Sequence, residues 1–235
     1  RFILGASIVY LIANTIFSSD RVFYMTYNLG MSQTQISLMM AIITVSGVAF
    51  VPFIAKLSAI FDKKTVFMVG IGVSGVLMIA GRFFGVQSLA AVIAICLIYS
   101  VANTCYWQLM PSMLYDVCEV EELVSGKKHS GSVISLQALS ESLSIAAGLQ
   151  ALGIALEMAG FASEAVVQPE GALTWVSNLF TLIPGVFMIL VFVIMASQFE
   201  SLTYPFVIMF SIPFAVVGVV IGLAITGTPI NIMAL

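Results

Sequence analysis

Long apolar runs separated by short polar connections make up most of this chain. A helix that crosses a bilayer needs about 20 largely apolar residues. Open strands would leave backbone groups without hydrogen bonds in lipid, so the runs are predicted to be helices. The predicted spans are residues 3–28, 35–58, 65–85, 88–114, 131–158, 173–196 and 205–226, with 229–235 as the start of another.

Composition supports the same conclusion. Hydrophobic residues make up 61% of the 235 residues and charged residues only 8%, whereas a soluble domain carries roughly 25% charged residues. The chain is therefore predicted to be an all-α integral membrane protein. A net charge of −3 offers no basic face to nucleic acid. The three cysteines lack paired spacing, so no disulfide is expected.

Basic residues are confined to alternate connections, which predicts the orientation of the spans. No Lys or Arg occurs in 29–34, 86–87 or 159–172. By the positive-inside rule, the basic connections and the N-terminal end are cytoplasmic. The residues that carry this prediction are Lys56, Lys63, Lys64, Lys127 and Lys128. The chain opens on Arg1 and closes inside an apolar run, so we expect it to be a fragment at both ends.

Residues 115–130 are predicted to form a cytoplasmic loop that contains Asp116 and Glu119. The run DVCEVEEL in this loop lacks ordered ligand spacing, which favours a solvated segment over a metal site. No nucleophile, base and orienting group occur together anywhere in the sequence. This argues against an enzyme.

Charged residues inside the predicted spans are the first candidates for function. Asp20 and Arg21 occur in the first span, where a charge at mid-bilayer costs about 2.5–3.5 kcal/mol. Neighbours on a helix point about 100° apart, so the two need not pair. Either one of them lines a polar cavity, or both extend to water near the outer boundary. Arg82, at the end of the third span, is expected to be an interface anchor.

The fourth and fifth spans each carry polar residues four positions apart, which share a helix face. Asn103 and Trp107 suit a sugar, whose apolar ring face stacks while its hydroxyls form hydrogen bonds. The alternative is an interfacial Trp with polar groups that pack helices. Gln137 and Glu141 either border a cavity or pair across helices, and Arg21 is one candidate partner for Glu141.

The segment GIGVSG at 70–75 matches a dinucleotide fingerprint formally. That fingerprint requires a preceding strand, whereas this segment lies inside an apolar helix. The glycines of this region are instead expected to allow close contact between helices, as are later ones. The positions outside the motif are Gly81, Gly85, Gly218 and Gly222.

The run YWQLMPSMLYDVCEVEELVSGKKHSGSVISLQAL resembles the C-terminal half of the glycoside–pentoside–hexuronide:cation symporters, the melibiose-permease branch of the major facilitator superfamily. That family has a Trp late in its tenth helix, a D-x-x-[DE] loop and a Gln on its eleventh helix. FDKKT at 61–65 fits its loop between helices eight and nine. The matching residues here are Trp107, Asp116, Glu119 and Gln137. The resemblance covers residues 1–196 and implies six transmembrane helices.

This resemblance implies a sugar site at Trp107 and transport coupled to Na⁺ or H⁺, in a cytoplasmic membrane of bacterial type. Where the melibiose permease has a functional Lys, this chain has Ser142 next to Glu141. That difference puts the melibiose-type substrate and coupling in doubt. The family's cation site is built mainly from acids of an N-terminal half, which becomes an expected partner beside the solute and the lipid bilayer. Asp20 and Arg21 remain candidates for a coupling or cavity charge.

The end of the chain resembles a different family. Residues 197–235 resemble a transmembrane segment of resistance-nodulation-division efflux proteins. The resemblance is carried by the run that starts at Met195, MASQFESLTYPFVIMFSIPFAVVGVVIGLAITGTPINIMAL. The sequence leaves open whether the junction is natural.

The sequence therefore predicts a secondary transporter of a sugar or related polar solute, without covalent chemistry or a bound cofactor. One alternative is a half-transporter that is inactive or must associate with another half. Another is a proton-driven multidrug exporter, and a membrane enzyme is the weakest.

Overall fold

The computed structural model describes residues 2–86, 88–126, 130–162 and 168–197. In this part of the chain six helical segments are long and apolar enough to cross a membrane. They are α1 (Phe2–Phe23) continued by the π-helix η1 (Tyr24–Asn28), α2 (Gln33–Ile60), α3 (Lys63–Phe84), α4 (Leu89–Ser125), α5 (Ser130–Met158), and α6 (Glu170–Ser177) continued by η2 (Asn178–Leu182) and α7 (Ile183–Ser197).

The prediction of an all-α membrane fold with six spans is confirmed. The predicted spans at 205–226 and 229–235 lie outside the described residues, as do Lys127, Lys128, Gly218 and Gly222.

The predicted loop at 115–130 is wrong over most of its length, because α4 continues to Ser125. Asp116 and Glu119 are therefore helical residues. Leu and Glu are good helix formers, and no Gly or Pro interrupts the polar run before Gly126. Gly126 ends the helix in the left-handed conformation at φ 68°, which glycine adopts without steric cost. A polar segment is not by that fact a loop, because polarity does not oppose helix formation.

Local signals fix where other helices begin. Ser32 and Gln35 form a reciprocal capping box at the start of α2, which satisfies backbone N–H groups that have no partner within the helix. Ser88 accepts a hydrogen bond from the Ala91 N–H at 3.2 Å and starts α4.

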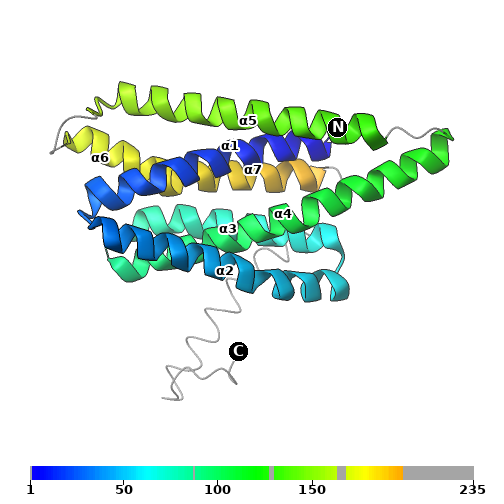
Figure 1. The fold of residues 1–235 in the computed structure, drawn as a ribbon, viewed down its shortest axis with the longest axis horizontal. Coiled ribbons are helices and arrows are strands. Elements are labelled where there is room, and N and C mark those ends of the chain that lie inside the picture. Colours follow the sequence, from blue (N-terminus) through cyan, green and yellow to red (C-terminus); the bar gives the residue numbers. More distant parts are fainter. Residues whose placement is uncertain (1, 87, 127–129, 163–167, 198–235) are drawn as a thin grey trace, which may run out of the picture.

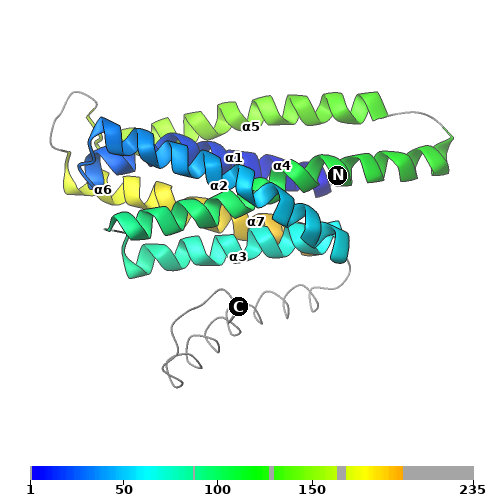
Figure 2. The same ribbon diagram turned by 60° about the horizontal axis from the view of Figure 1, so that its bottom comes forward.

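The helices run along a common axis and alternate in direction (Figures 1 and 2). Several helices that pack together are far apart in the sequence. α1 lies between α5 and α7, α3 packs against α4 and α7, and α2 packs mainly against α4. Alternation places the connections near Ile60 and Ser125 at the same end of the bundle as Phe2 (Figure 1). The helix ends next to the predicted basic connections thus share one end of the bundle, and the side of the membrane that this end faces stays a prediction.

Close helix contact at glycines, predicted from the sequence, occurs between α3 and α7. A Cβ on Gly185 would lie 2.9 Å from the Gly75 carbonyl oxygen and 2.8 Å from Ile79 Cγ1. Gly81 contacts Ile95 of α4 in the same way. Gly85 serves differently, because it ends α3 at φ +81° with no atom near its would-be Cβ.

Candidate functional site

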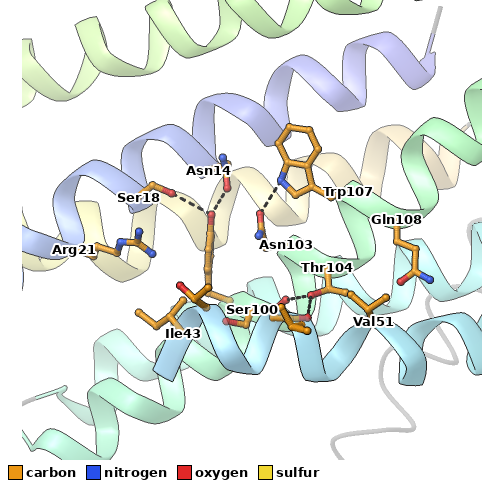
Figure 3. Close-up of a pocket in the computed structure, with 14 residues that line it drawn as sticks. Asn14, Ser18, Arg21, Ile43, Val51, Ser100, Asn103, Thr104, Trp107 and Gln108 are labelled. Carbon is orange, nitrogen blue, oxygen red and sulfur yellow. Dashed lines mark hydrogen bonds between the residues drawn. The ribbon is translucent and has the colours of Figure 1, made fainter. Parts of the chain in front are cut away.

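A cavity of about 580 Å³ lies between α1, α2 and α4, and most of its polar lining comes from α1 and α4. We call it the α1–α4 cavity (Figure 3). It is lined by Asn14, Ser18, Arg21, Ile43, Thr44, Gly47, Val48, Val51, Tyr99, Ser100, Asn103, Thr104, Trp107 and Gln108.

The α1 wall carries one permanent positive charge. Arg21 extends from α1 towards the cavity, on the same helix as Asn14 and Ser18 (Figure 3). The Tyr99 hydroxyl of α4 donates a hydrogen bond to Asn14 Oδ1 and lies 3.4 Å from the Ser18 hydroxyl. Tyr99 therefore holds the two polar residues of α1 in place, while the guanidinium supplies donors and forms no ion pair with any acid among the described residues.

The α4 wall presents an aromatic ring beside an amide. Trp107 Nε1 donates to Asn103 Oδ1 at 3.1 Å, and Tyr10 of α1 donates to the same oxygen at 3.4 Å. This arrangement fixes the amide and leaves its NH₂ group as a donor. Trp107 is 50% exposed, so a large part of its indole is open to contact with a solute.

Gln137 and Glu141 join a hydrogen-bonded cluster that links α5 to α1 and α4. Gln137 Nε2 donates to Ser7 Oγ at 2.7 Å and to Glu141 Oε1 at 3.1 Å. The Ser7 hydroxyl lies 2.6 Å from the Tyr106 hydroxyl, and Tyr106 stacks on Tyr10 at 4.2 Å. A smaller cavity of about 120 Å³ lies here, and Trp107 lines both this cavity and the α1–α4 cavity.

Several buried polar atoms beside these two cavities have no partner among the described residues. They are Arg21 Nε, Gln108 Oε1 and Gln137 Oε1. Buried polar groups are nearly always hydrogen-bonded, so each such atom requires an explanation. A polar solute that brings its own donors and acceptors into the cavities would satisfy them.

The remaining predicted site residues lie elsewhere. Asp20 is fully buried and does not line the α1–α4 cavity. Ser142 is exposed, and its hydroxyl donates to the Ala138 carbonyl of its own helix at 3.1 Å. Asp116 accepts from Lys63 Nζ at 2.9 Å, far along α4 from the cavity, and Glu119 is exposed.

Glu141 and Arg82 each have a hydrogen-bond partner in the structure. Glu141 bonds to Gln137 on its own helix, and the alternative pairing with Arg21 is not formed; within the described residues Lys63–Asp116 is the one ion pair. Arg82 Nε donates to Asn178 Oδ1 at 2.7 Å and ties α3 to η2, while its role as an interface anchor stays a prediction.

The sequence analysis missed the tyrosines of the site. Tyr10, Tyr99 and Tyr106 position its amides and hydroxyls. A signal was present, because Ser7, Asn14, Ser18 and Arg21 recur at intervals close to whole helical turns and thus mark one polar face of α1. For metals, the described residues contain no group of three His, Cys, Asp or Glu side chains that could hold an ion.

Comparison with known proteins gives two matches to family models. The model described as MFS/sugar transport protein matches residues 1–199. The model described as AcrB/AcrD/AcrF family matches residues 172–235. The two matches overlap over the helices from α6 to α7. A search of curated proteins found no match.

Proposed function

The chain belongs to the family of MFS/sugar transport proteins, and from this premise we propose that it moves a sugar or a related polar solute across a membrane by binding and alternating access. It is a multi-pass membrane protein of the major facilitator kind. The finer assignments are part of the proposal: coupling to Na⁺ or H⁺, likeness to the melibiose-permease branch, no covalent chemistry, and a cytoplasmic membrane with the N-terminal end inside.

The observation that carries this proposal is the aromatic and amide wall of the α1–α4 cavity. The exposed indole of Trp107 offers an apolar face, and Asn103 and Arg21 offer donors beside it. A sugar has apolar ring faces and a rim of hydroxyls, so it can stack and form hydrogen bonds at the same time. Trp107 and Asn103 hold each other, and Tyr10 holds the same amide, as a binding site requires.

Two helices at the sides of the bundle, α2 and α5, are largely exposed, and this exposure is evidence for a second six-helix unit as a partner. In the most apolar window of α2 only 17% of the residues are buried, and in α5 28%, against 44% in the α1–η1 segment and 50% in α4. α2 and α5 are thus less enclosed than the helices they flank. In transporters built from repeats, substrate binds between two halves near the middle of the membrane. We propose that another half closes the cavity, from the same polypeptide or from a separate one.

A binding experiment tests the proposed function. The full chain, reconstituted with phospholipid, is titrated with a panel of monosaccharides, glycosides and polyols. Tryptophan fluorescence is recorded for the wild type, and the affinities of all variants are measured by isothermal titration calorimetry, because Trp107→Ala removes the tryptophan of the cavity. We expect quenching by at least one sugar or glycoside. Trp107→Ala should weaken the affinity by about fivefold or more, which corresponds to the roughly 1 kcal/mol of a lost ring contact.

Trp175 of α6 provides the matched control, because it is 41% exposed but lines neither cavity beside Trp107. Trp175→Ala should leave the affinity unchanged. No quenching by any sugar in folded protein, or equal affinity in wild type and Trp107→Ala, would contradict a sugar site at this wall.

A further inference from the structure

Asp20 is a carboxyl group inside the bundle that has no partner in the part of the chain the structure describes. Its side chain is 0% exposed, and neither carboxylate oxygen has a hydrogen-bond partner among the described residues. It lies in the α1–η1 segment, roughly two-thirds along the span Phe2–Asn28. Although Arg21 is the next residue, the guanidinium turns to the α1–α4 cavity and forms no ion pair with Asp20.

The surroundings of Asp20 are aromatic. Phe17 and Tyr24 precede and follow it by three and four positions, so the three residues share one face of the helix. Both rings stack on Phe180 of η2, with ring centroids 5.1 Å and 4.4 Å apart. Asp20 therefore shares its helix face with two rings that stack on Phe180, and it has no hydrogen-bond partner among the described residues.

These surroundings decide which form of the carboxyl is stable. An isolated ionised carboxylate is strongly disfavoured in an apolar environment, and such groups become neutral instead. Hard metal cations require several oxygen ligands. No described hydroxyl or amide lies within hydrogen-bond distance of either oxygen of Asp20. A single carboxyl of this kind suits a proton rather than a metal cation.

Few charged groups could compensate Asp20 from the neighbouring elements. η2 and α7 contain no titratable residue, and the carboxylates of α5 and α6 lie in the Gln137 cluster or are exposed. α4 faces α1 with tyrosine hydroxyls that are bonded to Asn14 and Ser7. The groups considered are Glu141 and Glu157 of α5, Glu170 of α6, Tyr99 and Tyr106 of α4, Arg82 of α3, and Arg21 and Tyr24 beside Asp20 itself.

Tyr24 connects the buried acid to a second cavity. Tyr24 follows Asp20 by about one helical turn, its hydroxyl donates to the Val86 carbonyl, and it lines this cavity together with Arg82. The second cavity has a volume of about 360 Å³ and shares no lining residue with the α1–α4 cavity. It is lined by Tyr24, Asn28, Leu29, Arg82, Gly85, Val86 and Ser177.

We infer that Asp20 is the group that binds the coupling proton, which reaches it from the polar cavity around Tyr24 and Arg82. This inference rests on the proposed transport function and narrows the coupling ion to H⁺. The proton binds one carboxylate oxygen to give the neutral acid and leaves again as a proton, without any change in the bonds of the solute. Arg21 and Asp20 are adjacent on one helix, so a movement of α1 that accompanies solute binding also moves the acid.

Infrared spectroscopy and solute binding together test this inference on the full chain in phospholipid bilayers. The protonated acid should give a carbonyl stretch that disappears in Asp20→Asn and returns, shifted, in Asp20→Glu. Wild-type affinity for the solute should fall as pH rises through the titration of this band, by at most about tenfold per pH unit for one linked proton. Asp20→Asn should bind solute independently of pH over that range.

Glu157→Gln, which removes an exposed carboxylate of α5, is the control and should retain both the band and the pH dependence. If the band persists in Asp20→Asn, or if the variant keeps the pH dependence of the wild type, the inference is overturned while the transport function stands. If Asp20→Asn does not fold, Asp20→Glu decides: an unshifted band overturns the inference. If the wild type binds no solute, the proposed function itself fails.

Discussion

The α3–α7 contact and the α1–α4 cavity differ in almost every property, although both lie between membrane helices. At α3–α7 the backbones approach so closely that a Cβ on Gly75 would lie 2.9 Å from the Gly185 carbonyl oxygen. Across the α1–α4 cavity the walls stand apart and carry amides, hydroxyls, an indole and a guanidinium.

The difference separates stability from function. Lipid tails are as apolar as Leu, so helices associate in membranes largely through close packing, which small residues permit. Polar groups within a span are costly and mark solute or ion pathways. Substitutions at the contact should therefore unfold the protein, and substitutions in the cavity should change binding and spare the fold.

The largest effect is expected for Gly185→Val at the α3–α7 contact. A β-branched side chain there would collide with Ile79 and with the backbone of Gly75, and overpacking a tight site costs about 1–3 kcal/mol or more. We expect low expression and a thermal unfolding transition that is several degrees lower, measured in detergent by size-exclusion chromatography after heating.

Gly153→Val on α5 is the matched control, because no atom lies within 4 Å of its would-be Cβ. It should behave almost like the wild type. Equal losses in the two variants would show that the α3–α7 contact is no tighter than an open helix surface.

An intermediate effect is expected for Glu141→Gln in the cluster beside the cavity. The amide keeps the shape and an oxygen that can accept from Gln137, but removes the charge. Because Glu141 and Trp107 line the same small cavity, we expect a roughly tenfold loss of solute affinity, about 1.4 kcal/mol, in equilibrium titrations with unchanged thermal unfolding. Unchanged affinity with lower stability would assign Glu141 to helix packing and would weaken the contrast between the two regions.

The smallest effect is expected for the Lys63–Asp116 ion pair, which belongs to neither region. Its side chains are 40% and 54% exposed, and exposed pairs contribute about 0–1 kcal/mol. A double-mutant cycle of Lys63→Gln and Asp116→Asn should give a coupling energy below about 1 kcal/mol that decreases with added salt. A coupling of several kcal/mol, insensitive to salt, would reveal a third region that stabilises the fold.

The six spans within the described residues could be predicted from the sequence, because lipid requires every backbone group to be bonded within a long apolar helix. The same local reasoning failed at residues 115–125 of α4, where helix continues beyond the apolar run. It found Trp107 with Asn103, and Gln137 with Glu141, since residues four apart share a face whatever the fold.

Only the tertiary structure decided which helices meet and what each charge faces. Arg21 and Asp20 are adjacent in the sequence, yet one lines the α1–α4 cavity and the other is fully buried in the bundle. Tyr106 meets Ser7 across 99 positions, and Arg82 meets Asn178 across 96. Helical periodicity gives the direction of a side chain relative to its own axis, whereas the partner depends on how whole helices pack, and no local pattern contains that information.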